Sequence, residues 1–155
     1  MIRNVEHDDL ENVRSLIARS IAHSVAKTKE ELVFLTTDIG ESLDAWRADP
    51  SDAVHLLYEK DGLLAGVILV KKYWNLCTLF VDPSAQRRGI GRSLLDAVVP
   101  ICRQRSPKGK LMLNSSSVAV PFYRAYGFRQ TGPGLDRVGG CVPMEMAFGS
   151  AVEPA

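Results

Sequence analysis

The chain is poor in cysteine and has no long hydrophobic run. Its three cysteines, Cys77, Cys102 and Cys141, are odd in number and lie far apart. This distribution argues against a disulfide framework and against a closely spaced zinc site, so we expect buried thiols and no metal. The longest apolar run covers eight residues, 63–70, whereas a transmembrane helix needs about 20. We therefore expect this run to be a buried strand and expect no membrane partner.

Neither sign of charge dominates the sequence. Nineteen basic residues (Lys+Arg 19) are balanced by Asp+Glu 18, which gives a formal net charge of +1. Such a surface supplies no strong field for nucleic acid or anionic lipid, and we expect neither as a partner. The first residues, MIRNVEHDDLENV, carry acids and no apolar leader, which predicts a cytoplasmic protein.

The length and composition are those of one globular domain. The chain has 155 residues, 46% of them hydrophobic and 24% charged, which argues against disorder, collagen and coiled coil. A domain of this size buries enough apolar surface to fold without disulfide bonds or bound metal ions. We expect a folded domain over residues 1–149 and a frayed tail at 150–155.

Periodicity predicts a mixed succession of strands and helices. Asp61-Gly62 favours a tight type I′ hairpin turn, and Asp8 with Glu11 predicts a helix cap. Pro100 should kink or end the helix that contains it, and Gly127 should end the next helix in a left-handed conformation. The expected strands are 2–6, 53–60, 63–71, 75–81, 110–114, 128–131 and 141–148, and the expected helices are 8–25, 37–46, one beginning at Gly89, and 118–126.

The segment 79–98, LFVDPSAQRRGIGRSLLDAV, carries the most chemistry. Gly89 and Gly91 allow a ligand to approach the backbone closely where a helix begins, and a helix N-terminus attracts anions. Neighbouring arginines add positive charge, so an anionic cofactor is expected. The P-loop pattern is absent, and the dinucleotide pattern GxGxxG fails because Leu94 replaces its third glycine. The alternative is an ordinary helix start with surface arginines.

Two motifs in this order resemble those of the GNAT superfamily of N-acetyltransferases. QRRGIG, residues 86–91, is similar to its acetyl-CoA signature, and LNSSSVAVPFYRAYGF, residues 113–128, is similar to its second motif. The resemblance extends over residues 2–148. It implies an α/β fold whose central sheet is mixed, mostly antiparallel, built of about seven strands, splayed in the middle and flanked by about four helices. Acetyl-CoA would be the co-substrate, residues 1–149 the acetyltransferase domain, and a homodimer an open possibility.

The resemblance also implies particular site residues. Backbone amides of 88–92 would cradle the cofactor pyrophosphate, and the strand 79–81 would pair with the pantetheine arm. Tyr123 would protonate the departing thiolate as the catalytic general acid, because a phenol keeps its proton at pH 7; the alternative is an aromatic core residue. Helix capping, an alternative role for Asn114, belongs more naturally to Ser116 or Ser117. The cofactor-binding set is Leu79, Phe80, Val81, Gln86, Arg87, Arg88, Gly89, Ile90, Gly91, Arg92, Ser93 and Asn114.

The general base is not identified by the sequence. Several GNAT enzymes use a carboxylate on the strand that corresponds to 75–81, but here no acid occurs before Asp82. A covalent route through Cys77 lacks an adjacent histidine and is not expected. The remaining candidates, each also readable as a solvated or strand-surface residue, are His23, His55, Glu59 and Glu145.

The sequence thus predicts an N-acetyltransferase that moves an acetyl group from acetyl-CoA directly to an amine through a ternary complex. The acceptor would be a small molecule, an amino acid or a peptide, selected by residues 22–49 and 131–140. One alternative is a sensor module of the same fold that binds acetyl-CoA with little or no transfer activity. Another is a nucleotide- or phosphate-binding protein unrelated to acyl transfer.

Overall fold

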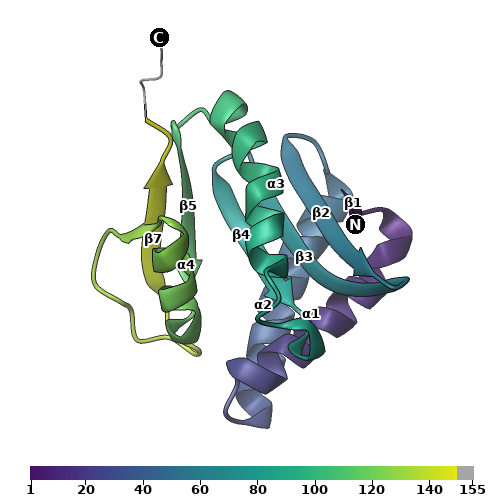
Figure 1. The fold of residues 1–155 in the computed structure, drawn as a ribbon. Helices are drawn as coiled ribbons and strands as arrows, with labels where there is room; N and C mark the ends of the chain where they lie inside the picture. Colours follow the sequence, from purple (N-terminus) through teal and green to yellow (C-terminus); the bar gives the residue numbers. More distant parts are fainter. Residues whose placement is uncertain (150–155) are drawn as a thin grey trace.

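The structure, a computed structural model, describes residues 1–149, so the expected frayed tail lies outside the described residues. Seven strands and four α-helices follow one another along the chain, as the sequence predicts (Figure 1). The strands are β1 (Ile2–Asn4), β2 (Ala53–Lys60), β3 (Leu63–Lys71), β4 (Asn75–Val81), β5 (Lys110–Ser115), β6 (Arg129–Gln130) and β7 (Val142–Ala147). The helices are α1 (Leu10–Ser24), α2 (Lys29–Ala48), α3 (Ile90–Arg105) and α4 (Val120–Tyr126), with short 3₁₀ turns η1 (His7–Asp9), η2 (Pro83–Ala85) and η3 (Ser117–Ala119).

All seven strands form one sheet in the order β1-β2-β3-β4-β5-β7-β6. Every neighbouring pair is antiparallel except β4 and β5, which run parallel and are joined by the single pair Asn75 and Met112. Beyond this pair the two strands diverge, and β5, β7 and α4 form a separate block beside the rest (Figure 1). The sheet is therefore mixed and splayed in the middle, as the resemblance implies.

Helices cover both faces of the sheet and define two hydrophobic cores. One core packs α3 and α4 against the sheet, with Leu94, Leu95 and Val98 fully buried. The other packs α1 and α2 against the opposite face, around Leu16 and Leu43. The gap between β4 and β5 is therefore flanked by α3 and α4 on one face of the sheet and by α1 and α2 on the other.

The predicted local turns are confirmed. Asp61 and Gly62 both have positive φ, 54° and 76°, as a type I′ hairpin turn requires. Gly127 has φ of 132°, and its N–H and that of Phe128 both donate to the Tyr123 carbonyl, which ends α4. All three cysteines are free, with Cys102 and Cys141 buried and Cys77 half-buried.

Helix α2 is longer than the sequence indicates. The prediction 37–46 is too short, because the helix begins at Lys29, where the Thr28 hydroxyl accepts a hydrogen bond from the Glu31 N–H at 3.1 Å. Only three of its 20 residues are buried. Because so few of its residues face the core, the sequence of α2 shows only a weak helical periodicity of hydrophobic residues. This explains why the predicted helix is too short.

Two other local predictions are corrected. Asp8 is not a cap: Asp9 accepts the Glu6 N–H at 2.8 Å and forms an ion pair with Arg3, and α1 begins only after the η1 turn. Of the two outcomes predicted for Pro100, a kink or an end of the helix, the end is wrong, because α3 continues to Arg105. The buried residues on both sides of the proline hold the helix to the sheet and offset the lost backbone hydrogen bond.

Candidate active site

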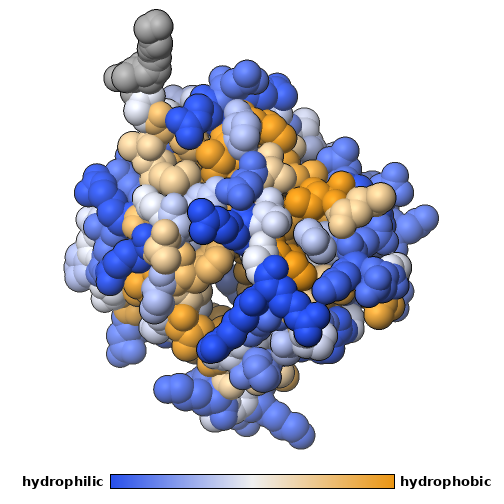
Figure 2. Space-filling model, in the orientation of Figure 1, coloured by the Kyte–Doolittle hydropathy of each residue, from blue (hydrophilic) through white to orange (hydrophobic). Residues whose placement is uncertain are grey.

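The open place between β4 and β5 contains two joined cavities. The smaller, of about 490 Å³, lies at the start of α3, and the larger, of about 590 Å³, lies between α2 and the loop 131–141. The space-filling view is hollowed between α4 and the start of α3 (Figure 2). The residues that line both cavities mark their junction: Val25, Leu79, Phe80, Ser116, Ala119 and Tyr123.

The exposed edge of β4 presents backbone groups to this gap. Across the β3–β4 ladder, the Asp82 N–H donates to the Ala65 carbonyl at 2.8 Å. Because antiparallel strands alternate paired and unpaired residues, Phe80 pairs with β3 while Leu79 and Val81 direct their N–H and C=O groups away from it. The Val81 carbonyl accepts hydrogen bonds from the side chains of Ser20 and Gln86. With β5 splayed away, the Val81 N–H and both backbone groups of Leu79 are free to pair with an extended ligand.

The glycine-rich turn ends in an uncapped helix N-terminus. Gly89 has φ of 81° and precedes α3, and the first helical hydrogen bond is that of the Ser93 N–H with the Gly89 carbonyl, at 2.9 Å. The N–H groups of residues 90–92 therefore have no partner within the helix. A Cβ at Gly91 would lie 3.2 Å from the Phe122 ring, so the backbone approaches closely here. Such a terminus binds a phosphate group without special side chains.

The structure gathers most of the predicted cofactor-binding residues at these cavities. Arg88 and Ser93 line neither, and Asn114 lines the larger cavity, away from the glycine turn. Neither Ser116 nor Ser117 caps α4 as predicted: Ser116 precedes the η3 turn without a capping hydrogen bond, Ser117 lies within η3, and α4 begins after Ala119 with no side-chain cap. The predicted residues that line the smaller cavity are Leu79, Phe80, Val81, Gln86, Arg87, Gly89, Ile90, Gly91 and Arg92.

Tyr123 lies at the junction of the two cavities. Its ring packs edge-on against Phe122 and Phe128, with centroid distances of 5.3 and 5.5 Å, so it is both an aromatic core residue and a cavity-lining one. Burial raises the pKa of its hydroxyl above the ordinary value. The phenol therefore stays protonated at neutral pH and can donate a proton at the junction.

The four candidate bases lie away from the gap, since none of them lines either cavity. Glu59 forms an ion pair with Arg3, and Glu145 pairs with two basic side chains. His55 is buried against Trp46, and burial lowers its pKa to about 4. His23 is exposed on α1.

Two cavity residues went unrecognised in the sequence. Asp38 of α2 and Asp136 of the loop 131–141 line the larger cavity, and neither forms an ion pair with another residue of 1–149. They lie in the two regions expected to select the acceptor, but no pattern distinguishes them from other acids there. Only the packing of α2 opposite the loop brings them to one cavity.

Two features are absent from the described part of the chain, residues 1–149. None of the helices there is long and apolar enough to span a bilayer. In the same part of the chain, no cluster of three or more His, Cys, Asp or Glu side chains is arranged to hold a metal ion.

Comparison with known proteins agrees with this geometry. Residues 24–148 match the family described as Acetyltransferase (GNAT) domain. The peptidyl-lysine N-acetyltransferase YiaC of Escherichia coli (strain K12) is 35% identical over 79 residues, 50% of this chain and 51% of YiaC. The matched part of the chain thus spans about half the length of YiaC. It spans 22% of a second curated relative, the UPF0157 protein YqkA of Bacillus subtilis (strain 168).

Solved structures show the same fold. A GCN5-related N-acetyltransferase of Rhodopseudomonas palustris superposes with a TM-score of 0.80 at 19% identity, covering 95% of this chain and 94% of that one. The PaiA N-acetyltransferase of Thermoplasma acidophilum, solved in complex with coenzyme A, gives 0.74 at 22% identity, covering 95% and 98%. The chain belongs to the GNAT family of acetyltransferases.

Proposed function

We propose that this protein transfers an acetyl group from acetyl-CoA directly to an amine within a ternary complex. The observation that carries the proposal is the meeting of two cavities at Leu79 and Tyr123. One cavity offers an anion-binding helix start, and the other offers an apolar wall with the charged side chains of Asp38, Asp136 and Arg137. A donor and an acceptor can thus enter from different sides and meet at one place.

Acetyl-CoA occupies the smaller cavity in this proposal. Its pyrophosphate accepts hydrogen bonds from the N–H groups of residues 90–92, and Arg87 and Arg92 add positive charge at the same cavity. Its pantetheine arm pairs with both backbone groups of Leu79 and with the Val81 N–H like an added strand. The thioester then lies at the junction, beside Tyr123.

The chemistry needs one bond made and one broken. The neutral amine attacks the thioester carbon, and the Leu79 N–H stabilises the negative charge on the carbonyl oxygen. The carbon–sulfur bond then breaks, and Tyr123 gives its proton to the departing thiolate; a proton from solvent then restores the phenol. The proton released from the amine returns to solvent through water or through Asp38 or Asp136, the carboxylates of the acceptor cavity.

The acceptor proposed here is a primary amine on an alkyl arm. Asp38 and Asp136 attract an ammonium group to the mouth of the larger cavity, where they outnumber its one basic residue, Arg137. Phe34 and Leu35 supply an apolar wall for methylene groups. The similarity to YiaC, named as a peptidyl-lysine N-acetyltransferase, supports a lysine side chain of a peptide as the first acceptor to examine.

The alternative is a module that binds acetyl-CoA without transferring the acetyl group. The absence of a carboxylate on β4 within the gap favours it, because no fixed base lies beside the thioester. The two readings differ in what happens after acetyl-CoA has bound.

Calorimetric titration with acetyl-CoA, and separately with ATP, tests binding first. Release of free thiol is then followed with lysine peptides, free amino acids and spermidine as acceptors. Acetyl-CoA binding with thiol release on one acceptor class is the expected result. Binding without release on any acceptor would favour the sensor reading, and tighter binding of ATP would contradict both.

A further inference from the structure

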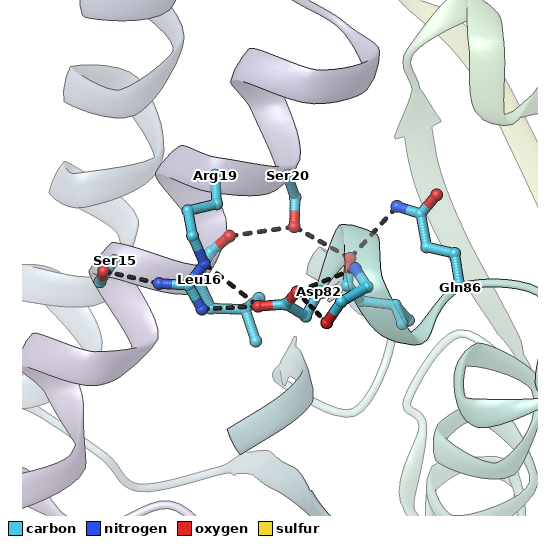
Figure 3. A network of polar contacts seen from close by, with 8 residues as sticks. Ser15, Leu16, Arg19, Ser20, Asp82 and Gln86 are labelled. Carbon is cyan, nitrogen blue, oxygen red and sulfur yellow. Dashed lines mark hydrogen bonds and ion pairs between the residues drawn. The ribbon is translucent and has the colours of Figure 1, made fainter. Parts of the chain in front are cut away.

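A polar network joins α1 to the end of β4 and to the cofactor turn (Figure 3). The Ser20 hydroxyl lies 3.0 Å from the Val81 carbonyl oxygen and 2.9 Å from that of Leu16. The Gln86 side-chain amide donates to the same Val81 oxygen at 3.2 Å. The last carbonyl of β4 is thus held from two sides, by α1 and by the first residue of the QRRGIG segment.

An ion pair in the same network fixes the next residue. The Arg19 guanidinium donates to one oxygen of Asp82 at 2.6 and 3.1 Å, while the other oxygen accepts the N–H and hydroxyl of Ser84 at 3.0 and 2.8 Å. Burial raises the pKa of Asp82, but the bonds from Arg19 and Ser84 outweigh burial and bring the pKa below its ordinary value. Asp82 therefore stays ionised and links α1 to the η2 turn.

From these contacts we infer that Ser20 and Gln86 are positioning residues that set the end of β4 for the pantetheine arm. Both lie within hydrogen-bond distance of the Val81 carbonyl oxygen, which faces the gap because the neighbouring Asp82 N–H pairs with β3. The Gln86 amide donates to this oxygen, and the single proton of the Ser20 hydroxyl is shared between it and the Leu16 carbonyl oxygen. The cofactor is left with the Val81 N–H and both backbone groups of Leu79.

The inference changes the role of Gln86. The cofactor signature suggests that its side chain contacts the cofactor, yet the amide group is engaged with the β4 backbone. Ser20 contacts the same atom from α1; the residue is only 4% exposed and borders the smaller cavity. Val25, the residue that follows α1, lines both cavities, so the network ties β4 to the helix that leads to the acceptor side.

The test compares two ligands that differ by the pantetheine arm. Coenzyme A carries it, and 3′-phosphoadenosine 5′-diphosphate does not, although both carry the pyrophosphate. Ser20→Ala and Gln86→Met each remove one donor to Val81 without adding charge. Each should weaken coenzyme A binding about 3- to 10-fold, the range of one hydrogen bond, and leave the nucleotide fragment within about twofold.

Ser15→Ala serves as the matched control, because Ser15 lies on the same helix and accepts from Arg19 but does not reach β4. It should leave both affinities unchanged. A thermal melt of each variant checks that it is folded. Equal weakening of both ligands would assign Ser20 and Gln86 a general structural role, and unchanged coenzyme A affinity would remove any role; either result overturns the inference.

The inference rests on the cofactor placement proposed above, and the two fail differently. If the wild-type protein binds both ligands and Gly91→Val loses both, the placement stands, and the behaviour of Ser20→Ala decides the network alone. If Gly91→Val binds coenzyme A normally, the pyrophosphate lies elsewhere, and the placement and the positioning role are both overturned.

Discussion

The two cavities that meet at Tyr123 are built in different ways. The smaller one centres on the end of β4, the glycine turn and the start of α3, which follow one another in the chain, and it offers the backbone N–H groups of the uncapped helix start; Ser20 and Ser24 of α1 and residues from 116 to 123 complete its wall. The larger one takes its charged groups from side chains of α2 and of the loop 131–141. A backbone site suits a ligand shared by many proteins, whereas a side-chain site can change its ligand through a few substitutions.

The largest effect is expected from blocking the backbone site. Gly91→Val would place a branched side chain where the backbone must approach the pyrophosphate, with its Cβ already 3.2 Å from the Phe122 ring. Acetyl-CoA binding should fall by about 100-fold or more, measured by calorimetric titration. Gly132→Val is the control, because a Cβ there meets only Pro143 at an ordinary 3.6 Å. Unchanged affinity in folded Gly91→Val would place the cofactor elsewhere.

The next effect concerns the junction. Tyr123→Phe removes the proton donor and keeps the ring that packs on Phe122 and Phe128, so kcat should fall by about 10² while acetyl-CoA affinity stays within about twofold. Steady-state thiol release and titration measure the two quantities. The matched control is Tyr126→Phe, whose hydroxyl bonds Asp96 outside both cavities. Full activity of Tyr123→Phe would leave this ring with a packing role only.

A smaller effect is expected on the acceptor side. Asp38→Asn and Asp136→Asn should each raise the KM of a cationic acceptor about 3- to 5-fold, because exposed charges interact weakly across water. The KM for acetyl-CoA should not change. Glu41→Gln, on the same helix but outside the cavity, is the control. If the control shifted the acceptor KM as much as Asp38→Asn, overall charge rather than these positions would select the acceptor.

The smallest effect concerns the core beneath the acceptor wall. His55 packs at 4.3 Å, ring to ring, on Trp46 of α2, and burial, with a contribution from Lys71, lowers its pKa to about 4 against 6.5 for an ordinary histidine, although Asp9 opposes the shift. As the pH falls, His55 therefore takes up a proton in the unfolded chain at a higher pH than in the folded protein. Stability is full above pH 6.5 and is lost as the pH falls towards 4.

Between pH 7 and pH 5.5 this linkage should cost about 1 kcal/mol of unfolding free energy, measured by urea denaturation. His55→Leu should flatten the dependence, whereas His23→Gln, a change at an exposed position, should keep it. An equally steep dependence in His55→Leu would show that other groups titrate.

The contiguous features were predictable from the sequence because each depends on local geometry. The Asp61-Gly62 turn, the glycine turn before α3 and the Gly127 helix end need particular φ values that few residues adopt, so the residue types reveal them. The full extent of α2 was not predictable, because the Thr28 side chain caps its first turn while the helix buries only a narrow stripe of residues. Pro100 likewise reads as a break, but tertiary packing keeps α3 intact.

What the sequence alone determined is the order of strands and helices and the segment that can bind an anionic cofactor. Both follow from hydrophobic period and backbone geometry within short stretches of chain. Only the tertiary structure decided which charged groups line the acceptor cavity. It places Asp38 and Asp136 at the same cavity, and it places His55 and Glu145 outside it. Such choices depend on how distant segments pack across the sheet, and no local pattern carries that information.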